Sequence, residues 1–133
     1  MTEKEIVAAI DSKRREGKRV FVCGNGGSAA NAEHFTNDLF SKGVRAVCLS
    51  SNTAIMTMIA NDYGYEHVFS RQLEVFSDPD DLLIVISCSG TSGNILQALE
   101  MGLESIEFFG GNGTYGEMES EHSALCHRIS EDL

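Results

Sequence analysis

Short apolar runs alternate along this sequence with segments in which apolar residues recur every three or four positions. The apolar runs are typical of buried strands, and the recurrent spacing is typical of amphipathic helices. We expect strands at residues 19–23, 46–50, 82–87, 105–109 and 124–129. We expect helices at residues 3–16, 28–40, 53–59, 67–76 and 92–101, with a short helical turn at 116–120.

The run 82–87 has no polar alternation, which is typical of a central strand covered on both faces. Strands that alternate with helices predict a parallel sheet, and right-handed crossovers place the helices on both of its faces. The predicted fold is therefore α/β, a three-layer α/β/α sandwich with a doubly wound, parallel, five-stranded sheet of the flavodoxin-like type. With 133 residues and no linker-like segment, residues 1–133 are expected to form a single domain.

The chain is acidic, with a formal net charge of −10. This charge argues against binding to nucleic acid and to anionic membranes, because both require a basic surface. No apolar run approaches the roughly 20 residues of a membrane span, and the first residues lack a signal-peptide pattern, so we expect a cytoplasmic protein. The four cysteines, Cys23, Cys48, Cys88 and Cys126, form no Cys-x-x-Cys pair and are expected to be free thiols.

Two loops rich in glycine and serine follow predicted strands. The first, residues 24–28, leads into a helix that Ser28 is placed to cap. The second places four hydroxyl side chains close together, those of Ser87, Ser89, Thr91 and Ser92. Both loops fall at the carboxyl ends of parallel strands, where ligands bind in such sheets. Because hydroxyls and helix N-terminal amides can hold a phosphate without Lys or Arg, we predict a site for a phosphorylated metabolite.

The first loop leaves two other interpretations open. Gly24, Gly26 and Ala29 fit the dinucleotide-binding pattern G-x-G-x-x-A. That pattern also expects an acidic residue at the end of the second strand, where this chain has Ser50-Ser51-Asn52. The glycines can also serve only to make a tight turn.

Three segments resemble signature segments of sugar isomerase (SIS) domains, and most closely those of the phosphoheptose (sedoheptulose 7-phosphate) isomerase family. They are residues 24–28 with His34-Phe35, residues 59–65 with 69–72, and residues 86–94. The resemblance extends over about residues 18–113. It implies a short form of the family's fold and an aldose–ketose isomerase that acts on a sugar phosphate.

The resemblance also implies roles for particular residues. It places phosphate binding at Ser87, Cys88, Ser89 and Ser92, and sugar binding at Asn25, Gly26, Gly27, Ser28, Asn61 and Asp62. His34 falls on a metal-ligand position, and Asp38 falls where the family has a glutamate that is both metal ligand and catalytic base. Their i, i+4 spacing puts both on one helix face, as in many ordinary surface pairs. We expect His34 and Asp38 to be catalytic and metal-binding, with zinc as the candidate metal and an incomplete ligand set.

Two features depart from the family. Asp38 is one methylene shorter than glutamate, which moves the carboxylate by about 1.5 Å. Family members continue into a long C-terminal helix whose glutamine and histidine complete the site, and we expect no counterpart here, since His122 and His127 do not match that pattern. Two hypotheses therefore stand, a minimal sugar-phosphate isomerase and a non-catalytic sugar-phosphate-binding or regulatory SIS module.

The expected partners are a phosphorylated sugar and further copies of the same chain. The chain is short, and apolar helix faces such as that of Ile6 and Ile10 are expected to pack against a partner subunit. We therefore predict a homo-oligomer, either a dimer or a tetramer.

Overall fold

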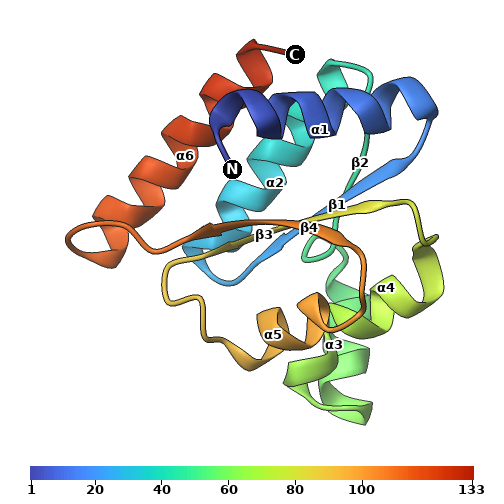
Figure 1. Cartoon of the computed structure of the whole chain (residues 1–133). Coiled ribbons are helices and arrows are strands. Elements are labelled where there is room, and N and C mark those ends of the chain that lie inside the picture. The colour runs from blue at the N-terminus through green and yellow to red at the C-terminus, as the bar shows by residue number, and fades with distance from the viewer.

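A four-stranded parallel sheet, with strand order β2-β1-β3-β4, forms the middle layer of the fold (Figure 1). The computed structural model describes residues 1–133. The strands are β1 (Arg19–Gly24), β2 (Arg45–Cys48), β3 (Leu82–Ser87) and β4 (Glu104–Phe109). Every residue of β3 is buried, which confirms the prediction that this run forms a central strand.

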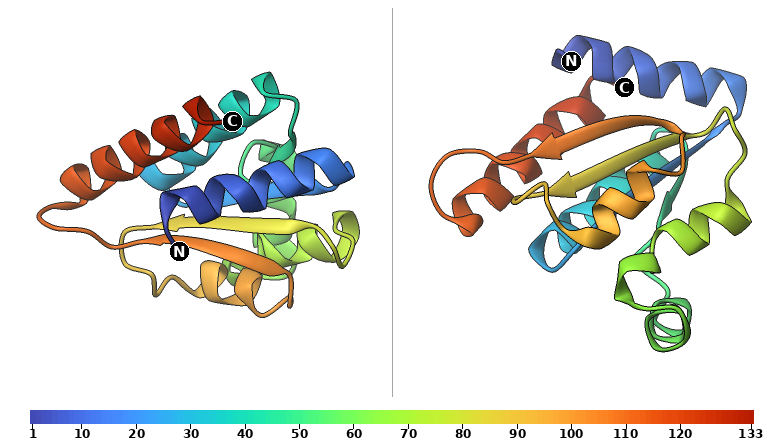
Figure 2. Two further views of the ribbon diagram at one scale, coloured as in Figure 1. Left: turned by 45° about the horizontal axis from the view of Figure 1, so that its top comes forward. Right: turned by 60° about the horizontal axis from the view of Figure 1, so that its bottom comes forward.

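Helices cover both faces of the sheet and make the predicted three-layer sandwich (Figure 2). One face carries α1 (Glu3–Glu16), α2 (Gly27–Ser41) and α6 (Tyr115–Glu131). The other face carries α3 (Thr53–Asp62), the 3-10 helix η1 (Tyr65–His67), α4 (Ser70–Phe76) and α5 (Gly93–Leu99). None of these helices combines the length and the apolar character that crossing a membrane requires.

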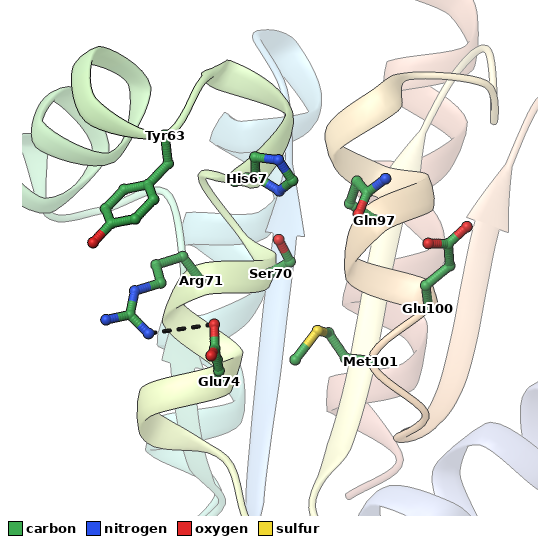
Figure 3. Close-up of a pocket in the computed structure, with 8 residues that line it drawn as sticks. All are labelled: Tyr63, His67, Ser70, Arg71, Glu74, Gln97, Glu100 and Met101. Carbon is green, nitrogen blue, oxygen red and sulfur yellow. Dashed lines mark ion pairs between the residues drawn. The ribbon is translucent and has the colours of Figure 1, made fainter.

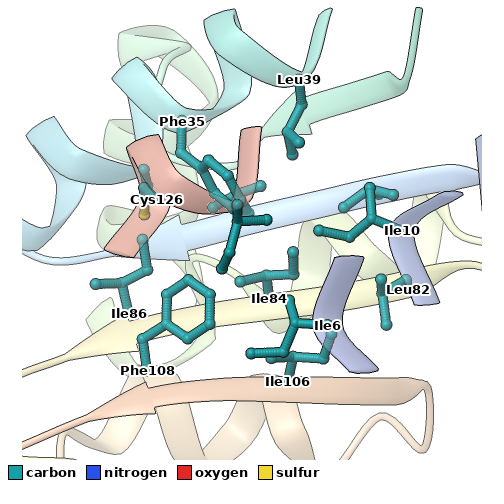
Figure 4. Close-up of a cluster of buried hydrophobic side chains, with 14 of the residues drawn as sticks. Ile6, Ile10, Phe35, Leu39, Leu82, Ile84, Ile86, Ile106, Phe108 and Cys126 are labelled. Atoms are coloured by element: carbon teal, nitrogen blue, oxygen red, sulfur yellow. The ribbon is translucent and has the colours of Figure 1, made fainter. Parts of the chain in front are cut away.

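The larger core lies between the sheet and the helices α1, α2 and α6 (Figure 4). Ile84 of β3 lies there with Phe35 of α2 and Phe108 of β4, whose ring centroids are 6.1 Å apart. Ile6 and Ile10 of α1 belong to the same core and are 6% and 0% exposed. The expectation that these two side chains pack against a partner subunit is therefore wrong, because α1 buries them within its own chain.

The largest difference from the sequence prediction lies after β4. Residues 124–129, expected as a fifth strand, lie inside α6, so the sheet has four strands rather than five. A capping box opens this helix, in which Thr114 and Glu117 each bond the other's backbone amide. The buried positions of α6 then follow a helical period at His122, Cys126, Ile129 and Ser130. The apolar triplet 124–126 is typical of a strand, but the capping box and this period determine the helix.

All four cysteines are free thiols, as predicted. Cys23, Cys48 and Cys126 are buried, whereas Cys88 is half-buried. Burial raises the pKa of Cys126 to about 12, with a smaller contribution from the Asp38 carboxylate. Burial also raises the pKa of the Cys23 thiol. The buried thiols therefore stay protonated and pack as small apolar side chains.

Candidate functional site

The two loops rich in glycine and serine meet at the carboxyl ends of neighbouring strands. β1 and β3 pair in parallel with Gly24 beside Ile86, so the loops that follow them leave the sheet side by side. Together the loops line a pocket of about 290 Å³, which we call the two-loop pocket. Eight residues singled out from the sequence line it: Asn25, Gly26, Gly27, Ser28, Ser87, Cys88, Ser89 and Ser92.

Gly24 sets the position of the first loop. A Cβ atom at Gly24 would lie 2.6 Å from the Ser28 carbonyl oxygen and 2.9 Å from the Ile86 carbonyl oxygen. Both contacts are with backbone atoms, which cannot move aside as a flexible side chain can. Glycine is therefore required where β1, β3 and the first turn of α2 approach one another.

The start of α2 differs from the prediction. Gly26, with a φ of 57°, is the N-cap residue, and no side chain caps the helix. Ser28 is 4% exposed and lies within the first turn, so the prediction that Ser28 caps the helix is wrong. The amides of Gly26 and Gly27 donate no hydrogen bond within the chain. These amides, together with the partial positive charge of the helix N-terminus, are available to an anion.

The second loop supplies hydroxyl groups. Ser87 Oγ accepts a hydrogen bond of 2.9 Å from the Gly90 amide, and Ser89 Oγ accepts one of 3.2 Å from the Thr91 amide. Each of these hydroxyls keeps its own hydrogen for donation. Ser92 precedes α5 but does not cap it through its side chain. The second loop therefore gives the two-loop pocket three serine hydroxyls, and the pocket has no lysine or arginine in its lining.

Asn25 connects the first loop to two other elements. Its side-chain amide exchanges hydrogen bonds of 2.8 and 2.9 Å with the side chain of Asn94 in α5. The Tyr65 hydroxyl of η1 donates a further hydrogen bond of 3.0 Å to Asn25 Oδ1. Asn94 is 2% exposed, so the network is anchored in the interior. Asn25 therefore holds the shape of the pocket as well as lining it.

α6 brings two residues to the two-loop pocket that the sequence analysis missed, Tyr115 and Glu119. The Glu119 carboxylate lies against Gly27, since a Cβ atom at that glycine would be 1.2 Å from Glu119 Oε2. The Asn31 side chain of α2 donates a hydrogen bond of 2.9 Å to the Glu119 carbonyl. Glu119 is the only carboxylate in the pocket lining. The capping box of Thr114 and Glu117 is a sequence signal that a helix begins here. It does not indicate where that helix packs.

Asn61 and Asp62 lie outside this pocket. Both are exposed in the last turn of α3, where the Asn61 amide donates a hydrogen bond of 3.0 Å to the Asp62 carboxylate. Neither residue lines the two-loop pocket. Within a single chain, the structure does not bring these two residues to the loops.

A separate pocket of about 540 Å³ lies between α4 and α5 (Figure 3). Its guanidinium group, that of Arg71, pairs with Glu74 at 3.3 Å and lies 5.6 Å from the centre of the Tyr63 ring. Glu100 adds a second carboxylate to the lining of this pocket. None of the site residues predicted from the sequence lines the pocket. Because its guanidinium is already paired, this pocket is a poorer place for a phosphate than the two-loop pocket.

His34 and Asp38 of α2 lie next to His127 of α6. Asp38 Oδ2 is 3.5 Å from His34 Nε2 and 3.5 Å from His127 Nδ1. The two imidazole rings have centroids 4.9 Å apart and meet edge to face. The expectation that no histidine near the C-terminus joins this pair is therefore wrong. The physical reason is that residues 124–129 continue a long helix instead of forming a strand.

These three side chains, the His34–Asp38–His127 cluster, fit a zinc ion. Their ligand atoms all lie within 4.8 Å of one another. Zinc bonds of about 2.0–2.1 Å put tetrahedral ligands about 3.3–3.4 Å apart, close to the two 3.5 Å separations between Asp38 Oδ2 and the imidazole nitrogens. Asp38 Oδ2 is buried and has no hydrogen-bond partner, so a cation would satisfy it. Three ligands that leave a position open are the donor set of a catalytic zinc site.

A line of contacts between α2 and α6, which we call the α2–α6 seam, joins the pocket to the cluster. The α2 residues on this line, spaced i, i+4, i+7 and i+11, are Gly27, Asn31, His34 and Asp38. The first two contact Glu119, and the last two contact His127. The two helices therefore run in the same direction. The rise of about 1.5 Å per residue places His34 about 9 Å beyond Ser28 along the axis of α2.

Comparison with known proteins identifies the family. The sequence profile of the SIS domain matches residues 4–105. The phosphoheptose isomerase of Helicobacter pylori strain P12 is 41% identical over 123 residues, covering 85% of this chain but only 64% of that protein, less than two thirds of its length. The phosphoheptose isomerase of Rhodospirillum rubrum is 36% identical over 132 residues, covering 94% of this chain and 70% of that protein.

A solved structure agrees with these matches. The phosphoheptose isomerase GmhA from Neisseria gonorrhoeae superposes with a TM-score of 0.92 at 27% identity, covering 98% of this chain and 83% of that one. The fold described above is thus the fold of that protein over nearly the whole of this chain. By sequence and by fold, the chain belongs to the SIS domain family and, within it, to the phosphoheptose isomerases.

Proposed function

We propose that this protein is an aldose–ketose isomerase that acts on a heptose phosphate of the sedoheptulose 7-phosphate type. The observation that carries the proposal is the α2–α6 seam, which has a pocket with neutral hydrogen-bond donors at one end and a carboxylate with two imidazoles at the other. Membership of the phosphoheptose isomerases supports the same reaction.

The phosphate group binds in the two-loop pocket. The hydroxyls of Ser87, Ser89 and Ser92 donate to its oxygens, and so do the unpaired amides of Gly26 and Gly27. Neutral donors suffice because the start of α2 contributes a partial positive charge. This explains how a chain with a net charge of −10 can bind an anionic metabolite.

A heptose 7-phosphate has the length that the seam requires. Its extended carbon chain and phosphate ester together span roughly 10 Å. The rise along α2 from Ser28 to His34 is about 9 Å. With its phosphate at the loops, such a sugar places C1 and C2 at the level of His34, whose Nε2 lies 3.5 Å from the Asp38 carboxylate, whereas a triose phosphate is too short to reach it.

The reaction moves one proton between C1 and C2 and another between their oxygens. Asp38 acts as the general base that takes the proton from one carbon and returns it to the other. Glu119, at the pocket end of the seam, accepts hydrogen bonds from the sugar hydroxyls. His34, Asp38 and His127 would hold zinc, which when bound acts as a Lewis acid toward substrate oxygens.

Replacing Ser89 with alanine is expected to weaken sugar-phosphate binding about tenfold, because one hydrogen bond to a charged group is lost. Isothermal titration with sedoheptulose 7-phosphate measures the change. Thr91→Val is the matched control, since Thr91 is exposed in the same loop but does not line the pocket. Equal losses in the two variants, or none in Ser89→Ala, would place the phosphate elsewhere.

We also propose a homo-oligomer in the cytoplasm. Two apolar side chains, Phe40 and Val47, are 73% and 37% exposed. A second subunit would cover such exposed apolar surface. Four free thiols are typical of a reducing compartment. Light scattering is expected to give a mass of two or four chains, and a mass of one chain at micromolar concentration would contradict the oligomer.

A further inference from the structure

We propose that the open edge of β4 binds an extended, positively charged segment of a partner protein, which adds a fifth strand to the sheet. β4 pairs only with β3 and forms the outer edge of the sheet (Figure 2). The register between the two strands runs unbroken from Glu104 to Phe109, so no bulge interrupts the edge. This proposal concerns a surface outside the two-loop pocket and does not depend on the isomerase activity.

The backbone of β4 is free to pair on its outer side. In a parallel ladder, the N–H and C=O groups of alternate residues point to opposite sides of a strand. The amide of Gly110 donates to the Ser87 carbonyl at 3.1 Å, on the side of β3. The alternation therefore directs the backbone groups of Ser105, Glu107 and Phe109 away from the sheet, where they are available to another strand.

The two edges of the sheet differ in a way that favours binding at β4. β2, at the opposite edge, has only four residues and includes Arg45. A short strand with a basic residue is a common device against unwanted pairing. β4 has six residues, ends in two phenylalanines and contains no proline, lysine or arginine. It is therefore the edge at which strand addition meets the least resistance.

A groove of about 580 Å³ runs beside this edge, between β4, the start of α1 and α6. Phe108 and Leu125 contribute apolar surface to it. His122 also lines the groove, although this residue is only 6% exposed. Its Nδ1 atom is buried and has no hydrogen-bond partner.

The charge of the groove identifies the occupant. Glu3, Glu107 and Glu121 line it with a single guanidinium, that of Arg128. Arg128 is already engaged by two hydrogen bonds of 3.1 Å to Glu3. Met1, with the N-terminal ammonium, also lines the groove, and neither Glu107 nor Glu121 forms an ion pair. A second copy of this chain, also at −10, would bring further negative charge. A strand that carries lysine or arginine complements these carboxylates, and its backbone pairs with β4.

The test uses the full chain and a fluorescent peptide of alternating lysine and valine, long enough to pair with all of β4. Fluorescence polarisation at fixed salt measures affinity, and amide hydrogen exchange followed by NMR locates the contact. We expect the peptide to protect the amides of Ser105, Glu107 and Phe109. We expect Glu107→Lys to weaken binding about tenfold, and Glu100→Lys to change it less than twofold. Glu100 is the matched control because it is an exposed glutamate outside the groove.

Three results would overturn the proposal. The first is peptide binding that leaves the β4 amides unprotected, or that both glutamate variants weaken equally, since either would mean non-specific attraction to an acidic protein. The second is protection of the same amides on raising the concentration of the chain alone, which would make a second copy the occupant. The third is no measurable binding of the peptide at millimolar concentration.

Discussion

Replacing His127 with alanine is expected to lower kcat by about 10²–10⁴-fold, the range that a general acid or base, or its immediate support, contributes. His127 is one of three side chains in the His34–Asp38–His127 cluster, and its Nδ1 is 3.5 Å from the proposed base. Its side chain is 47% exposed, so the fold does not depend on it. Steady-state kinetics with sedoheptulose 7-phosphate measure kcat, and titration with zinc measures the metal affinity, which should fall as well.

The same variant should bind the sugar phosphate with an affinity within about threefold of the unchanged protein, because each lost contact outside the phosphate site contributes little. His67→Ala is the matched control, since His67 lies at the α4–α5 pocket, away from the seam. Full activity in His127→Ala, or an equal loss of activity in the control, would show that the cluster is not the catalytic centre.

Replacing Gly24 with alanine is expected to lower the free energy of unfolding by about 2–4 kcal/mol, the range of a severe steric mutation. The added methyl would lie 2.6 Å and 2.9 Å from two backbone carbonyl oxygens, those of Ser28 and Ile86. Relief requires β1 and the first turn of α2 to separate, which widens the two-loop pocket. Urea unfolding measures the stability, and the fraction that still folds should bind sugar phosphate at least tenfold more weakly.

Gly116→Ala is the control for this substitution. Gly116 lies in the first turn of α6, where an added Cβ would meet only Thr114 Oγ1, at 3.8 Å. Alanine is favoured over glycine in a helix by up to about 1 kcal/mol, so this variant should be as stable as the unchanged protein or slightly more so. Equal stability of the two alanine variants would contradict the role of Gly24.

The sequence was sufficient to predict the fold as far as β4. The uninterrupted apolar run of β3 and the glycines that end the helices are local signals, and the structure has those elements within a few residues of their predicted ends. Residues 124–129 were misread because a short apolar run is ambiguous between strand and helix. The misreading added a fifth strand to the predicted sheet and left out the helix that carries His127.

Part of the candidate site was predictable from the sequence and part was not. The two loops were placed together correctly because the carboxyl ends of neighbouring parallel strands share one edge of the sheet. Glu119 and His127 were missed because they reach the seam only through the packing of α6 on α2, a contact between segments far apart in the chain. No local pattern encodes that packing. Ser28 was assigned a capping role that Gly26 fills instead.

Proton transfer between C1 and C2 of the sugar distinguishes an isomerase from a module that only binds sugar phosphates. The unchanged protein is incubated with zinc and sedoheptulose 7-phosphate in D₂O, and the sugar is followed by ¹H NMR. We expect the aldose heptose phosphate to form and deuterium to enter at the carbons that exchange a proton, and we expect both processes to be lost in Asp38→Asn. Saturable binding of the sugar phosphate with no aldose and no deuterium incorporation at any zinc concentration would rule out the isomerase activity. That result would leave a sugar-phosphate-binding module without catalysis.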